Sequence, residues 1–292
     1  MKVSIICPTF NGGDLLKKSL NAILNQKFDQ PYEIIFVDSS SNDGTAEHLN
    51  YQSEIHEHLH LYNIDQSEFE HGKTRNFAIS KSSGELIVLL TQDAIPANDY
   101  WLAIMVDTLE SKDIAGVFGR HIAHKNHPKL IHRDLDIHFN RMNETPIRKI
   151  EDWNSYKDDA SLRQRLHFFS NNNSALKRNI WEKSPFPEVD YGEDQTWAKK
   201  VIEKGYSLAY QHDSIVHHSH NFSLTQSCVR NWTEKNFYLN NFGYNLRINK
   251  KRILSILFSS IKKDFLWLLK TNQLKPREIV YSFKKNISAI SF

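Results

Sequence analysis

The first 120 residues alternate between short apolar runs and amphipathic stretches. Apolar runs at 3–8, 33–38, 59–64 and 85–91 are bounded by turn-forming residues, which is typical of buried strands. Between them, the stretches 15–26, 73–82 and 101–111 favour helices. Strands that alternate with helices predict a mostly parallel sheet flanked by helices on both faces. We therefore expect an α/β fold whose ligands bind at the carboxyl ends of the strands.

The pattern is less regular after residue 122. Strands are predicted at 116–122, 168–176 and 208–216, and a helix at 194–204. The stretch 123–165 is polar, rich in His and Arg, and has no clear period, so we expect it to be a loop over the site. Apolar residues recur at near-helical spacing from 253 to 268. We expect one domain over 1–225, followed by a helical, basic and amphipathic extension over 226–292.

Charge is distributed unevenly along the chain. The net charge is +3, but residues 247–292 carry 11 Lys and Arg against 2 Asp and Glu, which leaves −6 on the remainder. A basic amphipathic helix is typical of binding to an anionic membrane surface. Packing on the domain or on a second subunit, as in a homodimer, is the alternative. No nucleic-acid-binding module is recognisable, so no nucleic-acid partner is expected.

The remaining composition indicates a cytoplasmic protein. Apolar residues make up 40% of the chain, enough for a core, and no stretch reaches the roughly 18 apolar residues of a transmembrane helix. The first residues lack the pattern of a secretory signal, and the two cysteines, Cys7 and Cys228, give no disulfide framework. With the basic tail, this predicts a cytoplasmic protein that is peripheral on the inner face of the cell membrane.

Six short polar segments carry the candidate chemistry. They are CPTFN at 7–11, VDSSSNDGT at 37–45, HGKTRN at 71–76, TQDA at 91–94, GED at 192–194 and HHSH at 217–220. In this order they resemble the inverting glycosyltransferases of family 2, which have the GT-A fold. The TQDA and GKTRN forms are most similar to the rhamnosyltransferase branch. The resemblance covers roughly residues 1–225.

The resemblance implies transfer of a sugar from a nucleotide-sugar donor to a hydroxyl group. The implied donor is dTDP-L-rhamnose, with a UDP-sugar as the alternative, and the implied acceptor is a growing lipid-linked cell-surface polysaccharide. Two other functions stay open. One is a catalytically inert subunit that binds a nucleotide sugar or a glycan. The other is a sugar nucleotidyltransferase, although the loop at 11–14 lacks the Lys or Arg that this reaction would need.

The donor site is expected at the ends of the first strands. A carboxylate at Asp38, just past an apolar strand, can accept the ring N–H of uracil or thymine, which is the task of the family's aspartate there. A turn-forming role is the alternative. By resemblance, Pro8, Thr9 and Asn11 lie near the nucleotide. The cations of Lys73 and Arg75 suit the diphosphate.

A divalent cation, Mg²⁺ or Mn²⁺, is expected at Asp93, since such ions prefer carboxylate oxygens and can bridge two phosphates. The family often has a second carboxylate where this chain has Gln92, which we assign to the ribose. His218 and His220 follow the strand predicted at 208–216, and residues two apart in an extended strand point to one face. They are candidate metal ligands, although each can equally be an ordinary polar residue.

The catalytic base is expected at Asp194 by resemblance, because the family uses the aspartate of a Glu-Asp pair at a helix start. Neighbouring carboxylates would raise its pKa and the helix N-terminus would lower it, and the sequence does not decide between them. An ordinary acidic first turn is the alternative. Candidates for contacts with the acceptor or the sugar are Glu193, Asn172, Asn173, Trp153 and Tyr191.

Overall fold

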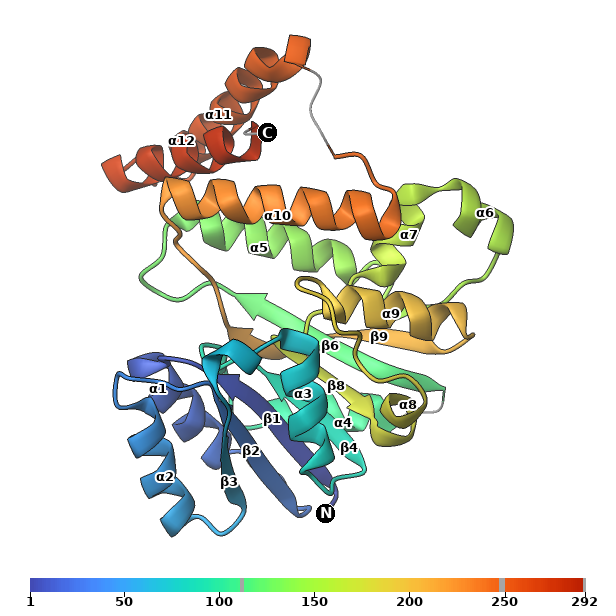
Figure 1. Ribbon diagram of the computed structural model, residues 1–292. Coiled ribbons are helices and arrows are strands. Elements are labelled where there is room, and N and C mark those ends of the chain that lie inside the picture. The colour runs from blue at the N-terminus through green and yellow to red at the C-terminus, as the bar shows by residue number, and fades with distance from the viewer. Residues whose placement is uncertain (111–112, 247–249, 291–292) are drawn as a thin grey trace. The chain divides into compact units, whose positions relative to one another are not determined.

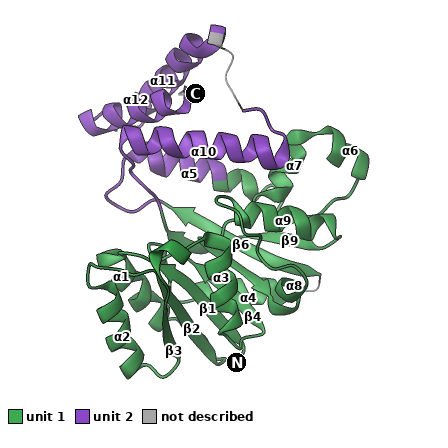
Figure 2. Cartoon of the chain, in the orientation of Figure 1, with its two compact units in different colours: residues 1–122, 139–218 green, residues 123–138, 219–292 purple. Residues whose placement is uncertain are grey.

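The computed structural model describes residues 1–110, 113–246 and 250–290. The chain forms two compact units (Figures 1 and 2). The first unit contains residues 1–122 and 139–218, and the second contains residues 123–138 and 219–292. The second unit therefore includes a segment from the middle of the chain as well as the C-terminal helices.

One sheet forms the framework of the first unit. Over the described residues its strand order is β3-β2-β1-β4-β8-β6-β9-β5, and β7 pairs with β9. The strands are β1 (Val3–Thr9), β2 (Tyr32–Asp38), β3 (Leu59–Asn63), β4 (Leu86–Leu90), β5 (Ile95–Pro96), β6 (Ile114–Ile122), β7 (Ile147–Arg148), β8 (Asn173–Lys177) and β9 (Ser207–His217).

The α/β architecture is confirmed, with a sheet that is mixed in direction. Strands β1 to β4 are mutually parallel where they pair, and β6 is parallel to β9. Strand β8 lies between β4 and β6 and runs antiparallel to both. The alternation of strands and helices predicted the parallel part, since each parallel connection needs a crossover. The antiparallel strands follow irregular connections that carry no such signal.

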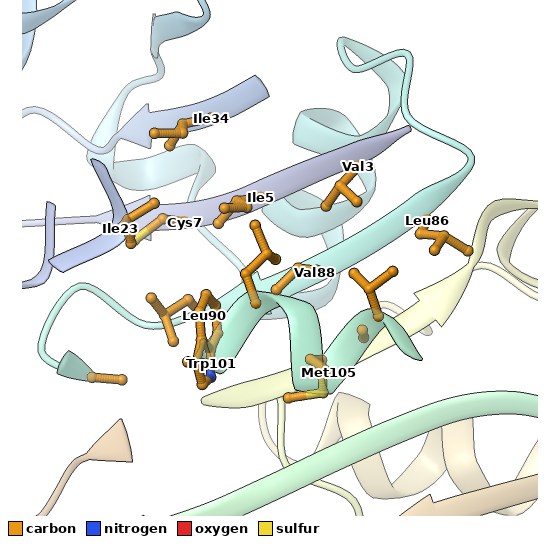
Figure 3. Packing of buried hydrophobic residues seen from close by; sticks show 14 of the residues in the cluster. Val3, Ile5, Cys7, Ile23, Ile34, Leu86, Val88, Leu90, Trp101 and Met105 are labelled. Atoms are coloured by element: carbon orange, nitrogen blue, oxygen red, sulfur yellow. The ribbon is translucent and has the colours of Figure 1, made fainter. Parts of the chain in front are cut away.

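Helices of the first unit pack on the strands of this sheet. They are α1 (Gly13–Leu24), α2 (Thr45–Ile55), α3 (His71–Ser80), α4 (Trp101–Glu110), α8 (Arg178–Lys183) and α9 (Glu193–Glu203). Val3, Ile5 and Cys7 alternate along β1 and pack into a buried cluster with Trp101 and Met105 of α4 (Figure 3). The intervening residues of the strand are also buried. Burial on both faces explains the continuous apolar runs of the sequence.

The expectation of a loop over 123–165 was wrong. This stretch contains α5 (Lys129–Met142), α6 (Trp153–Asp158) and the beginning of α7 (Ala160–His167), together with β7. The side chains of Asp152 and Asp159 cap α6 and α7 by accepting hydrogen bonds from backbone N–H groups of the first turn. Helices of six and eight residues are too short to show a clear hydrophobic period, so the sequence pattern missed them.

The second unit is helical. It contains α10 (Leu224–Phe242), α11 (Ile253–Lys270), α12 (Pro276–Ile290) and residues 129–138 of α5. Helix α10 starts at a capping box formed by Ser223 and Gln226. Of the residues expected to share one apolar face of α11, Leu268 is buried, whereas Leu254 and Phe265 are exposed. None of the described helices is both long and apolar enough to cross a bilayer.

A polar network joins the helices of the second unit. Asp264 of α11 accepts hydrogen bonds from Arg133 (2.6 Å), Ser282 (2.7 Å) and Asn286 (2.9 Å). Glu278 of α12 is fully buried and accepts hydrogen bonds from the backbone N–H groups of residues 129 and 130, at the start of α5. Helix α12 therefore turns a polar stripe inward, which ties it to α5 and α11.

Replacing Asp264 with alanine should destabilise this network strongly. Arg133 (2.6 Å) and Lys285 (3.2 Å) would lose this buried anion and keep the more exposed carboxylate of Asp134. Losing one partner of a buried ion pair costs about 3 kcal/mol or more. Urea unfolding followed by circular dichroism measures the change. Lys263→Ala, one residue earlier and exposed, is the control and should change stability little. Equal stability of both variants would contradict the importance of the network.

Candidate active site

The loops after β1 and β2 are tied together at one edge of the sheet. Thr9 and Asp38 are register partners at the ends of these strands. Asp38 is buried, and its carboxylate accepts hydrogen bonds from the backbone N–H (2.8 Å) and the hydroxyl (2.5 Å) of Ser41. Asn11 bonds to Ser41 and Asn42 of the same loop. Of the residues predicted near the nucleotide, Pro8, Thr9 and Asp38 thus lie at the ends of adjacent strands, and Asn11 lies in the loop after β1.

Gln92, in the turn after the neighbouring strand β4, fixes the loop after β1. Its side-chain oxygen accepts from the Thr9 hydroxyl (2.7 Å) and the Phe10 N–H (2.9 Å), and its amide nitrogen donates to the Phe10 carbonyl (2.9 Å). An ionised carboxylate cannot donate that last bond. Gln92 can therefore hold the Phe10 carbonyl, which the acidic residue that the family often has at this position could not do. The sequence had suggested the ribose as the partner of Gln92.

Asp93 and His218 lie close together. The carboxylate oxygen Oδ1 of Asp93 is 3.6 Å from Nε2 of His218. The pairing of β5 with β9 causes this approach, because Ile95 is the register partner of His217. Both side chains belong to the first unit and could together bind one metal ion. His220 follows at the start of the second unit.

Lys73 and Arg75, predicted as a pair, have different surroundings. Lys73 is exposed on α3. Arg75 is only 3% exposed, and its Nη1 lies 2.5 Å from Oε1 of Glu193, which is 5% exposed. Nη1 also donates to the carbonyl of His71 at 3.3 Å. The sequence spacing suggested two cations beside a phosphate, whereas the fold directs Arg75 to a buried carboxylate.

Asp194 lies in the first turn of α9, behind Gly192, whose φ of 72° favours glycine. Its carboxylate accepts hydrogen bonds from the backbone N–H groups of Gln195 (2.8 Å) and Asn171 (3.4 Å). Burial, followed by the charge of Glu193, raises the pKa of Asp194 to about 7. A carboxyl group with such a pKa can accept a proton near neutral pH. The raising effects therefore exceed those of the helix start.

Of the residues predicted to contact a sugar, Glu193 is buried against Arg75, and the other four divide into two groups. Asn173 is fully buried, and its side chain bonds to the Trp101 indole (2.8 Å) and the Ser214 carbonyl (2.9 Å). Its polar atoms therefore join elements of the core instead of facing solvent. Trp153 is exposed, and Asn172 and Tyr191 are half-buried. For these three residues, contact with a sugar stays a prediction.

Two asparagines were not singled out from the sequence. Asn171 donates through its side chain to Glu193 (3.2 Å) and through its backbone to Asp194. Asn76 of α3 bonds to both backbone groups of Phe186 and to the indole of Trp181. Asn76 is the last residue of HGKTRN, so the motif itself was the signal. For Asn171 the signal was the polar run 171–174 next to apolar residues.

Comparison with known proteins identifies the family. Residues 4–184 match the family model described as Glycosyl transferase family 2. The chain belongs to this family. It is 34% identical over 234 residues to the O-antigen chain rhamnosyltransferase RfbN of Salmonella typhimurium, covering 79% of this chain and 70% of the relative. It is 33% identical to WbaN of Salmonella anatum, described in the same words, covering 78% and 69%.

Solved structures give the same fold. The mannosyltransferase PcManGT of Pyrobaculum calidifontis, in complex with GDP-Man and Mn²⁺, aligns over 99% of this chain and 85% of its own with a TM-score of 0.65 and 18% identity. Residues 1–349 of TarS from S. aureus, in complex with UDP, align over 98% and 90% with a TM-score of 0.58 and 13% identity. The GT-A fold expected from the motifs is confirmed. The protein is a glycosyltransferase, in place of the nucleotidyltransferase and inert-subunit alternatives.

Asp194→Asn should stabilise the protein at alkaline pH. An aspartate has a pKa of about 3.9 in the unfolded chain, and that of folded Asp194 is about 7. Ionising this carboxyl group therefore destabilises the folded state progressively as the pH rises between these values, by up to about 4 kcal/mol. Asparagine avoids this cost.

Urea unfolding of wild type and Asp194→Asn at pH 5 and pH 8.5 measures the effect. The advantage of the variant should be larger at pH 8.5. Asp190→Asn, four residues earlier and exposed, is the control and should show no such pH dependence. An advantage that stays constant with pH would contradict the raised pKa.

Proposed function

We propose that this protein transfers L-rhamnose from dTDP-L-rhamnose to a hydroxyl group of a growing, lipid-linked surface polysaccharide, with inversion at the anomeric carbon. The names of the two Salmonella relatives support the sugar and the polysaccharide. The observation that carries the reaction is Asp194, a carboxyl group with a pKa near 7 at the start of α9. A base with this pKa can take a proton from an acceptor hydroxyl at physiological pH.

In the proposed reaction, Asp194 takes the proton of the acceptor hydroxyl as its oxygen attacks the anomeric carbon. The new C–O bond forms on the face opposite the diphosphate, and the bond to the diphosphate breaks. The carboxylate of Asp38, which is held by Ser41, accepts a hydrogen bond from the ring N–H of thymine. The exposed cation of Lys73 offsets the charge of the departing dTDP.

The residues present suit a divalent cation. Asp93 supplies a hard carboxylate oxygen, and His218, 3.6 Å away, supplies an imidazole nitrogen. Such an ion, Mg²⁺ or Mn²⁺, would neutralise charge on the diphosphate. The presence of Mn²⁺ with GDP-Man in PcManGT supports this proposal.

The reaction is tested with two variants that should fail differently. Asp194→Asn should lower turnover of dTDP-L-rhamnose about 100-fold or more, the usual effect of losing a general base, and leave dTDP affinity unchanged. Asp38→Ala should weaken dTDP binding by about 1–3 kcal/mol, because the ring N–H of thymine loses its buried hydrogen-bond acceptor. Calorimetry gives the affinity and a radiolabelled donor gives the turnover.

Asp190→Asn serves as the activity control and should behave like the wild type. For wild type, kcat/KM should fall as the pH is lowered through about 7, because Asp194 then carries a proton and no longer accepts one. Near-normal turnover of Asp194→Asn would show that another group is the base. Wild-type dTDP affinity in Asp38→Ala would mean that the nucleotide binds elsewhere.

We also propose that α11 and α12 hold the enzyme at an anionic membrane. Between residues 253 and 290 the acidic residues are Asp264 and Glu278, and both are buried and bonded to cations or N–H groups of their own unit. The charges that these helices expose are therefore basic, among them Lys262, Lys263 and Lys270. This surface suits the anionic headgroups of a bilayer.

The apolar side chains of these helices support the same partner. Leu254 and Phe258, one turn apart on α11, are 67% and 69% exposed, and Val280 of α12 is 66% exposed. Because α12 turns its polar stripe inward, its apolar residues are directed to the surface. Exposed apolar side chains beside lysines match the interfacial layer of a membrane. Two copies of this face would instead bring lysines against lysines, which disfavours the homodimer.

Leu254→Ser/Phe258→Ser should weaken binding to anionic vesicles at least about tenfold, since each side chain contributes about 1.5–3 kcal/mol when buried in an apolar phase. Sedimentation with phosphatidylglycerol vesicles measures binding, which should also weaken as salt rises. Tyr51→Ser, at an exposed position of α2, is the control. Failure of the wild type to bind at low salt would overturn the proposal, as would a dimer that the double variant dissociates.

A further inference from the structure

The residues of the HGKTRN motif lie in two different environments, one exposed and one packed against another segment. Lys73 is exposed, whereas Gly72, Arg75 and Asn76 all contact the segment 181–193 that leads into α9. We propose that these three residues form a dock for the segment that carries Asp194, and that Arg75 is a positioning residue that acts through Glu193 instead of binding the diphosphate. The inference rests on the proposed role of Asp194 as the base.

Gly72 permits the close approach of α3 to this segment. A Cβ atom at this position would lie 2.1 Å from the carbonyl oxygen of Pro187, far inside van der Waals contact. One turn further along α3, Asn76 donates to the carbonyl of Phe186 (2.9 Å) and accepts from its N–H (3.1 Å) and from the Trp181 indole (2.8 Å). The backbone before α9 is therefore fixed at both Phe186 and Pro187.

Arg75 fixes the start of α9 itself. Its ion pair with Glu193 is buried on both sides, and Asn171 donates to the same carboxylate oxygen at 3.2 Å. Asn171 also donates its backbone N–H to Asp194. Asn171 thus binds both Glu193 and Asp194, and Arg75 binds Glu193, the residue directly before Asp194. A guanidinium whose charge is offset by a buried carboxylate has little attraction left for a phosphate.

The pair also sets the electrostatics of the base. Burial opposes ionisation of Glu193, but the Arg75 guanidinium holds its pKa below the usual value, so that Glu193 stays charged. That charge adds to burial in raising the pKa of Asp194, while the charge of Arg75 lowers it. His71 is a further titratable group beside the pair, and burial and Arg75 lower its pKa, which leaves it neutral near pH 7. Glu193 therefore keeps Asp194 basic enough to accept a proton.

Three variants test the assignment. In Glu193→Gln the anion is lost, so the acidic limb of the kcat/KM profile should move by about one pH unit or more to lower pH. Arg75→Gln/Glu193→Gln replaces the ion pair with two neutral amides, which keeps a folded protein available if Arg75 alone proves too costly to bury. Its limb should move in the same direction. Lys73→Gln should leave the limb at its wild-type position.

Binding of dTDP with Mn²⁺, measured by calorimetry, separates the two roles of Arg75. The double variant should bind dTDP within about twofold of wild type, whereas Lys73→Gln should bind at least about tenfold more weakly. A tenfold loss in the double variant would show that Arg75 serves the diphosphate, and an unmoved acidic limb would show that Glu193 does not act on the base. The binding result does not depend on Asp194. If Asp194→Asn keeps its turnover, the proposed base fails while the role of Arg75 is still measured.

Discussion

The buried ion pair between Arg75 and Glu193 joins the two parts of the glycosyltransferase unit. Arg75 lies on α3, which packs on the parallel strands β1 and β2, and Glu193 begins α9, which packs on β9. More than a hundred residues separate them in the chain. Because both side chains are almost completely buried, neither tolerates the loss of the other. The position of α9, and with it that of Asp194, therefore depends on this contact.

Several polar side chains of the site are restrained by hydrogen bonds to neighbouring loops. Asp38 is held by Ser41, and Gln92 uses both ends of its amide on the loop after β1. Such arrangements hold polar groups in place before a ligand arrives, so that binding requires little reorganisation. Lys73 is different, because its exposed side chain can follow a phosphate. The groups that must be placed accurately are the ones that the fold restrains.

In the C-terminal helices, burial of the acidic residues makes the surface charge differ from the charge that the composition suggests. The tail has two acidic residues among many basic ones, and both acidic side chains are buried in the polar network of the second unit. The surface of these helices is consequently more basic than the sequence suggests. The apolar positions of α11, which the spacing placed on one face, divide between packing and exposure. The helix is apolar over more of its circumference than one neighbour can cover.

The family, the parallel strands and the positions of Asp38, Asp93 and Asp194 could be predicted from the sequence, because strand ends and helix starts leave local patterns. Local patterns could not reveal α6 and α7, which are too short, nor the direction of β8, which depends on its neighbours in the sheet. They also assigned Arg75 to a phosphate and Asn173 to a sugar. Both are polar residues beside a predicted site, and a sequence does not show whether a polar side chain faces solvent or a buried partner. Only tertiary structure decided that Arg75 meets Glu193 and that Asn173 meets Trp101, since burying a charge or an amide is favourable only where distant residues supply its partner.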